Sequence, residues 1–235
     1  MDLPPGQRET DGFPRFGVGG RVPRALAEHR LQVTGLGADL DLTLAELAAL
    51  PRTEVVADFH CVSGWSARDQ RWEGVRFRDL YHLVLRPHLG DDVAVTHVVL
   101  TGLDGYSSVA WLEDLLDPDV LLADRWAGRP LSRDHGAPLR LLSPAQYGFI
   151  STKHLARIGL HASEPRVRYH PTWSAHLGLQ VVKPHPRARV WREERHRYLP
   201  AALVRPVYRR LIRHFKSVNR SSDTSGQLPT RSGWV

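Results

Sequence analysis

The chain has 235 residues, of which 42% are hydrophobic and 24% are charged, proportions typical of a soluble globular protein. Its single cysteine, Cys61, excludes an internal disulfide, a CxxC redox pair and a zinc site made by several cysteines of one chain. The formal net charge of +7 is uneven, because residues 1–186 contain 20 Lys+Arg and 22 Asp+Glu, whereas residues 187–235 contain 12 and 3. The basic character therefore belongs to the C-terminal segment and is not a nucleic-acid signature for the main domain.

The first 29 residues are rich in Pro, Gly and charge and predict no regular element. They contain neither the apolar core of a signal peptide nor a twin-arginine pair, and no apolar run of about 18 residues occurs in the chain. We therefore expect a cytoplasmic protein without a transmembrane helix. A short strand is expected over residues 31–34, followed by a short helix over residues 43–50, in which Thr43 can cap the start and Glu46 occupies the capping-box position.

The stretch EVVADFHCVSG, residues 54–64, carries the strongest local signal in the chain. Its first half has the apolar, β-branched composition of a buried strand, and Ser63 and Gly64 indicate a turn after Cys61. A thiol at the exit of a buried strand is well placed to line a site, although a free cysteine is also a common small core residue. A polar and aromatic surround, expected in a loop, favours the site: His60, Trp65, Arg68, Asp69 and Trp72.

From residue 77 the sequence alternates short strands with short helices. A helix is predicted over residues 77–85 and a helical turn over residues 111–116. The predicted strands cover residues 93–100, 107–110, 120–126, 139–142 and 158–161. Loops are expected at residues 101–106, 134–138 and 144–149. Many short strands with few short helices and no internal repeat predict an α+β fold.

A candidate anion site follows the strand that carries Arg140. Ser151, Thr152 and Lys153 have the composition of a helix start, and we expect a short helix from there to Arg157. A helix N-terminus binds anions, the Arg140 guanidinium can donate two hydrogen bonds to a phosphate, and Lys153 adds a charge. An ordinary N-cap with two solvated cations would look the same, and no Walker GxxxxGK[ST] motif is present. Together with a soft thiolate ligand, this arrangement suggests a phosphorylated cofactor that carries a soft metal.

Two stretches of the chain resemble the molybdopterin-binding domain of the sulfite oxidase superfamily. They are DFHCVSGWS, residues 58–66, and HGAPLRLLSPAQYGFISTKHLARIGL, residues 135–160. The resemblance runs from about Phe13 to about Leu179 and is closest to the small bacterial branch that includes the catalytic subunit of the periplasmic methionine-sulfoxide reductase. It implies a mixed, β-rich fold of the sulfite oxidase type, a molybdenum–molybdopterin cofactor, and an oxidoreductase that moves an oxygen atom to or from a small substrate.

The resemblance also implies roles for individual residues. Cys61 matches the cysteine whose thiolate ligates molybdenum, and is the expected catalytic residue. His135 stands where the reductase branch has Asn, and a neutral imidazole can still donate one hydrogen bond to the pterin. The positions that match cofactor contacts are Asp11, Pro14, Arg15, Cys61, Thr101, His135, Arg140, Ser151, Thr152 and Lys153. The candidates for the substrate side are Trp65, Arg68, Asp104 and Tyr106.

Two other function classes stay open. Cys61 with a His and an acid would make a cysteine hydrolase, although no cysteine-protease signature is present. Residues 187–218 are expected to form a basic, largely helical extension, which is either docked on the domain of residues 1–186 or a module that binds nucleic acid, anionic lipid or an acidic redox partner. Residues 219–235 are expected to be disordered. A one-domain molybdenum enzyme also implies a small-molecule substrate and a separate electron-transfer protein, and no DNA is expected as its partner.

Overall fold

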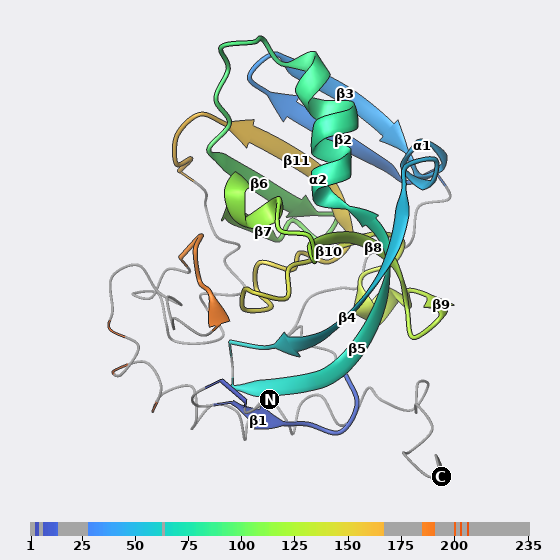
Figure 1. Cartoon of the computed structure of the whole chain (residues 1–235), viewed down its shortest axis with the longest axis vertical. Helices are drawn as coiled ribbons and strands as arrows, with labels where there is room; N and C mark the ends of the chain where they lie inside the picture. The colour runs from blue at the N-terminus through green and yellow to red at the C-terminus, as the bar shows by residue number, and fades with distance from the viewer. Residues whose placement is uncertain are drawn as a thin grey trace.

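The computed structural model describes residues 3–4, 7–13, 28–62, 64–166 and 185–190, together with residues 200, 203 and 206. In these ranges the chain forms two β-sheets joined by a few short helices (Figure 1). The predicted α+β, β-rich architecture is confirmed. None of the helices that the structure describes has the length and apolar character needed to cross a bilayer. Pro14 and Arg15, most of the basic extension and the predicted tail of residues 219–235 lie outside the described residues.

The first sheet has five strands in the order β3–β2–β11–β6–β7. Their bounds are β2 Arg30–Gly35, β3 Ala38–Thr43, β6 His97–Gly102, β7 Ser107–Trp111 and β11 Leu155–His161. The central strand β11 is parallel to β2 and antiparallel to β6. Alternate side chains of these strands are buried and form one face of the main hydrophobic core. After β3 comes α1 (Leu44–Ala48), whose start has the predicted capping box between Thr43 and Glu46.

The predicted helix over residues 77–85 covers that apolar face (Figure 1). It starts as α2 (Phe77–Leu80), continues as the π-helical turn η1 (Tyr81–Leu85) and ends in the 3-10 turn η2 (Arg86–His88). Four apolar positions are expected from the periodicity. Phe77, Leu80 and Tyr81 are buried in the main core, and Val84 is partly buried against it.

The second sheet is organised around β5 (Trp65–Arg76), a long curved strand that leads from β1 to α2 (Figure 1). The other strands are β1 Arg8–Glu9, β4 Arg52–His60, β8 Leu121–Trp126, β9 Arg129–Pro130 and β10 Arg140–Leu142. Residues 52–60 pair antiparallel with residues 66–75. This pairing keeps residues 65–72 in a strand in spite of their charged side chains, so the prediction of a loop there is wrong.

Three further sequence expectations are corrected by the structure. No helix begins at Ser151, because residues 155–161 form β11 and pair with two neighbouring strands. His154 has φ +52°, a conformation that a right-handed helix does not contain, so the chain turns there into the strand. The strand predicted over residues 93–100 begins only at His97, and the N-terminal region, expected to lack elements, contributes β1.

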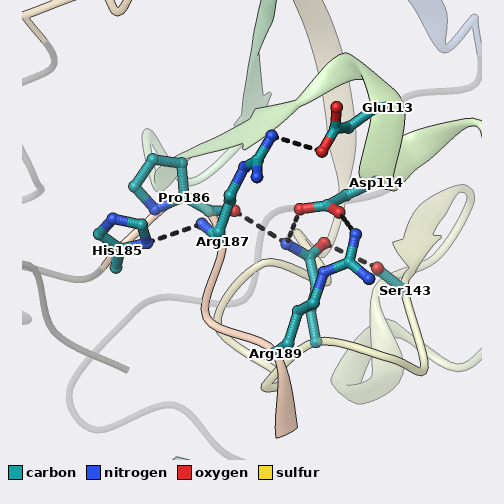
Figure 2. A network of polar contacts seen from close by, with 8 residues as sticks. Glu113, Asp114, Ser143, His185, Pro186, Arg187 and Arg189 are labelled. Atoms are coloured by element: carbon teal, nitrogen blue, oxygen red, sulfur yellow. Dashed lines mark hydrogen bonds and ion pairs between the residues drawn. The ribbon is translucent and has the colours of Figure 1, made fainter. Parts of the chain in front are cut away.

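Residues 185–190 pack against the main body beside α3 (Leu112–Leu115), as Figure 2 shows. Ala188 and Val190 are buried, and the Tyr147 hydroxyl donates to the carbonyl of Val190 at 3.1 Å. Two ion pairs connect the segment to α3, Arg187 with Glu113 and Arg189 with Asp114. The start of the basic segment is thus docked on the domain, whereas its function as a binding module stays a prediction.

The two ion pairs are expected to differ in strength. The Asp114 side chain is 2% exposed and also accepts from Gln146, whereas the Glu113 side chain is 59% exposed. Asp114→Asn is therefore expected to weaken docking by about 1–3 kcal/mol, and Glu113→Gln by only about 0–1 kcal/mol. Hydrogen exchange of the Val190 amide, which donates to a backbone carbonyl at 3.0 Å, measures the difference. Equal acceleration in both variants would contradict the expected dominance of the buried pair.

Candidate functional site

Cys61 lies directly after β4, where the predicted turn is present. The side chain is buried, with a residue exposure of 5%. Its backbone N–H donates to the Trp65 carbonyl at 2.8 Å, and its carbonyl accepts from Gly64 N at 2.9 Å and from Gln7 Nε2 at 3.1 Å. Gly64 has φ +94°, a conformation that glycine adopts without steric cost, which allows the tight turn. The backbone that carries the thiol is therefore held from several sides.

The thiol belongs to a second hydrophobic cluster, separate from the main core and formed largely by the second sheet. Phe13 lies at its centre. The Phe13 ring centroid is 4.9 Å from that of Phe59, 5.4 Å from that of Trp72 and 5.1 Å from that of His135. Edge-to-face and stacked rings at these separations attract one another and give a rigid wall. This cluster, which includes Cys61, is the candidate site.

Arg140 is a buried cation beside the same cluster. It is 1% exposed, and its guanidinium carbon lies 5.0 Å from the Trp72 ring centroid. The guanidinium donates to the carbonyls of His135 at 3.0 Å and Ser151 at 3.2 Å. Burial lowers the pKa of Arg140 to about 9, so the group is still protonated at neutral pH. Within the described ranges it forms no ion pair with a carboxylate. A buried charge without a counter-charge is costly, and a bound anion would offset that cost.

The predicted anion-binding residues 151–153 do lie beside Arg140, although in a loop rather than at a helix start. The Ser151 carbonyl accepts from Arg140, and Lys153 Nζ donates to the Asp134 carbonyl at 2.7 Å. The Thr152 hydroxyl lies 2.8 Å from the Ser108 hydroxyl. Loop geometry and the β10 strand, not a helix dipole, bring these groups together.

His135 stacks on Phe13 in the same cluster, and its hydrogen bonds define its tautomer. Its Nε2 lies 3.0 Å from the carbonyl oxygen of Phe13, and a carbonyl only accepts, so Nε2 carries the proton. Nδ1 then accepts from the Ser132 hydroxyl at 2.8 Å. Burial lowers the pKa of His135 to about 4, which keeps the ring neutral at physiological pH. The ring is neutral as expected, but its one N–H donates to the Phe13 carbonyl, so the predicted hydrogen bond to the pterin stays a prediction.

The remaining predicted residues lie further from this group or have structural partners. Asp11 is exposed, and the hydroxyl of Thr101 on β6 lies 2.9 Å from the Ser107 hydroxyl. Among the substrate-side candidates, Trp65 is buried in the aromatic cluster, whereas Arg68 lies 3.7 Å from Glu9 and 3.8 Å from Asp58. Asp104 accepts from the Tyr106 backbone at 3.1 Å, and the Tyr106 hydroxyl donates to the Phe149 carbonyl at 2.6 Å.

Gly148 is a site residue that the sequence analysis did not identify. Its N–H donates to the His60 carbonyl at 2.8 Å, which joins the loop of residues 144–149 to the end of β4. A Cβ at this position would lie 2.5 Å from Phe59 Cε1, far inside van der Waals contact. The only sequence signal was its place in the quoted YGF motif.

Gly148→Ala is expected to lower the free energy of unfolding by about 1–3 kcal/mol, because the added methyl group overpacks the aromatic cluster. Chemical denaturation measures the change. Gly90→Ala is the matched control, since a Cβ there would meet only Val93 Cγ2 at 3.4 Å, an ordinary contact. Identical midpoints for the two variants would show that the loop moves away from Phe59 without cost.

The donor set of the site suits a metal that arrives with its own ligands. In the part of the chain that the structure describes, no group of three or more His, Cys, Asp or Glu side chains could hold a metal ion. A metal carried by an organic cofactor needs fewer ligands from the protein, and the Cys61 thiolate can be one. The uncompensated charge of Arg140 suits an anionic cofactor. So does the buried Nε1–H of Trp72, which has no hydrogen-bond partner among the described residues.

Comparisons with known proteins identify the domain. A family model for the oxidoreductase molybdopterin binding domain matches residues 19–169. The oxidoreductase YuiH of Bacillus subtilis (strain 168) is 35% identical over 159 residues, which cover 66% of this chain and 77% of YuiH. The protein-methionine-sulfoxide reductase catalytic subunit MsrP of Pseudomonas syringae is 36% identical over 121 residues, covering 50% of this chain and 34% of MsrP.

More distant matches agree with these. The mitochondrial sulfite oxidase of Drosophila melanogaster is 32% identical over 157 residues, covering 56% of this chain and 27% of the relative. Among solved structures, the sulfane dehydrogenase SoxCD from Paracoccus pantotrophus matches with a TM-score of 0.53 at 20% identity, over 68% of this chain and 43% of that chain. The fold is therefore of the sulfite oxidase type, and the matched region spans about a third or less of the MsrP and sulfite oxidase chains.

Proposed function

The chain belongs to the oxidoreductase molybdopterin binding domain family, and on that basis we propose that it transfers an oxygen atom to or from a small substrate at a molybdenum ligated by Cys61. Membership of the family gives the cofactor, molybdenum–molybdopterin, and the enzyme class, an oxidoreductase of the sulfite oxidase type. The ligand, the reaction and the substrate are the proposed part.

The observation that carries the proposal is the buried Arg140 beside the Cys61 cluster. Its guanidinium is fully buried, donates to backbone carbonyls, and forms no ion pair with a carboxylate of the described residues. A bound anion would balance such a charge. Molybdopterin is a phosphorylated cofactor that would supply this anion and, with its molybdenum, the two-electron redox chemistry of oxygen-atom transfer.

The residues of the chain have separate roles in this proposal. The Cys61 thiolate would bind the metal as a soft ligand. Arg140 would balance the charge of the cofactor, and Lys153 beside it would add a second cation. His135, neutral and held by Ser132, would keep the N-terminal segment around Phe13 against the cofactor side of the cluster. The aromatic rings would exclude water, which strengthens each of these electrostatic contacts.

Elemental analysis by mass spectrometry, together with fluorescence of the acid-released, oxidised pterin, tests the proposal. The full chain is produced in a host that makes molybdopterin, and both molybdenum and pterin are expected near one per chain. Absence of both would overturn it. Pterin and molybdenum in the wild type, with both retained at equal occupancy in Cys61→Ala, would overturn the proposed metal ligand but not the cofactor.

Two related predictions belong to the same proposal. A separate electron-transfer protein is proposed because the relative MsrP is named a catalytic subunit. A cytoplasmic location stays a prediction that cell fractionation would test. The cysteine hydrolase finds no support in the comparisons, since the relatives reported above are named as oxidoreductases.

A further inference from the structure

Three buried polar side chains connect β1, β4 and β5 beside Cys61. Gln7, His60 and Ser66 are 8%, 7% and 0% exposed. His60 Nδ1 lies 2.8 Å from Ser66 Oγ, and Ser66 Oγ lies 3.1 Å from Gln7 Oε1. Gln7 Nε2 in turn lies 3.1 Å from the carbonyl oxygen of Cys61. The series therefore ends on the backbone of the cysteine.

The hydrogen bonds of this series can run in one direction only. The Cys61 carbonyl only accepts, so Gln7 turns its NH2 group to Cys61 and its oxygen to Ser66. Ser66 gives its single hydroxyl proton to Gln7, and its oxygen is therefore left to accept from His60 Nδ1–H. Hydrogen bonds in such a buried series polarise one another, which strengthens the last of them.

The position of Gln7 is fixed by the strand that follows it. β1 pairs in parallel with the start of β5, with Arg8 opposite Trp65. The Arg8 amide donates to the Gly64 carbonyl at 3.0 Å, so β1 closes on the turn that carries Cys61. Gln7 enters this turn from outside and binds the one peptide group that directly follows the thiol-bearing residue.

We propose that Gln7, held by Ser66 and His60, is a positioning residue for the Cys61 thiol. By fixing the peptide plane between Cys61 and Val62, it fixes the direction of the side chain. That this direction matters for binding molybdenum rests on the proposed function. The effect of Gln7 on the position of the thiol does not depend on that function. Residues that hold a metal ligand from behind typically change metal affinity or activity by about 10–100-fold when they are replaced.

The first test uses the full-length chain produced without cofactor, in a host that cannot make molybdopterin. Cys61 is the only cysteine, so mass spectrometry of iodoacetamide alkylation reports on one thiol. Gln7→Leu leaves the Cys61 carbonyl with the Gly64 amide alone and the Ser66 hydroxyl proton without its acceptor, and the turn is expected to open more often. The alkylation rate should rise about tenfold or more, with the thermal midpoint recorded to show that the variant is folded.

Gln146→Leu is the matched control. Gln146 is buried, accepts from the Ser143 hydroxyl at 2.8 Å, and donates to the Pro186 carbonyl at 2.8 Å and to Asp114 at 3.3 Å, so its amide also links separate segments through both of its ends. Its alkylation rate should equal that of the wild type. An equal acceleration in both variants, or none in Gln7→Leu, would overturn the proposal. If Gln7→Leu does not fold, Ser66→Ala is used instead, because it removes the hydrogen bond to the Gln7 oxygen. Its alkylation rate is then compared with that of Gln146→Leu in the same way.

The second test uses the protein loaded with molybdenum. Gln7→Leu is expected to shift the visible band of thiolate-to-molybdenum charge transfer and to lose molybdenum on dialysis about 10–100-fold faster than wild type. A chain that binds no molybdenum at all would remove the proposed function, while the alkylation result would still decide the role of Gln7. Unchanged alkylation, band and metal retention in Gln7→Leu, with molybdenum bound, would remove the positioning role alone.

Discussion

Cys61→Ser is expected to reduce oxidoreductase activity more than about 100-fold, beyond the usual effect of losing a residue that only supports a ligand. A serine hydroxyl is a harder and, at neutral pH, a protonated group, so it replaces the thiolate poorly as a ligand for a soft metal site. Serine is close to cysteine in size, and the turn around residue 61 is held by backbone hydrogen bonds, so the fold should be retained. Activity is measured with reduced dyes and sulfoxides, and with oxidised dyes and sulfite.

Metal and pterin content must be measured in the same Cys61→Ser preparation. The expected outcome is a folded protein that has lost the thiolate charge-transfer band and the activity, whether or not pterin is retained. Wild-type turnover in the variant would exclude Cys61 as the essential ligand. Because the chain has no other cysteine, no second thiol could take its place.

Arg140→Met is expected to reduce cofactor affinity by about 30-fold or more, the effect of removing one member of a buried charge pair. Methionine keeps an apolar stem of similar length among the rings of Phe13, Phe59 and Trp72, but it removes the charge. Cofactor content of the purified protein should fall from near one to less than about a tenth per chain. Arg140→Lys keeps the charge but not the planar guanidinium, so its cofactor content should lie between those of the wild type and Arg140→Met.

The control for Arg140→Met is Arg157→Met, which removes an exposed cation on β11. The Arg157 side chain lies 3.5 Å from Gln32. Its cofactor content should equal that of the wild type. Equal content in Arg140→Met and Arg157→Met would show that the buried guanidinium serves packing alone. The cofactor-free Arg140→Met protein should remain folded, because the loss of three hydrogen bonds is offset by the removal of a desolvated charge.

Much of the fold could be predicted from local patterns. The capping box of Thr43 and Glu46, the strand into Cys61 and the helix from Phe77 were confirmed, because their signals are contained in a few adjacent residues. Two assignments failed for the opposite reason. Residues 65–72 and 155–157 carry polar or helix-like sequences, and they lie in strands because the first pair with β1 and β4 and the second with β2 and β6.

The candidate site could be predicted in part. Cys61 and Arg140 were identified from local patterns and His135 through a resemblance. In the structure Cys61 belongs to one cluster, and His135 and Arg140 contact its rings. Gln7 could not be identified, because its role depends on a two-residue strand that pairs with a segment more than fifty residues away. The sequence also could not predict that the charge of Arg140 is uncompensated, because only the folded chain shows which carboxylates lie near it.

The central place of β11 has a consequence for how the site matures. β11 joins β2 across a separation of 125 residues between Arg157 and Gln32, and it follows the loop of residues 151–153 directly. Pairing over such a distance is slow, because closing a long loop costs entropy before the contacts form. We therefore expect the loop beside Arg140 to take its final place late in folding. Until then the group of Arg140 and Lys153 is expected to be incomplete as an anion site.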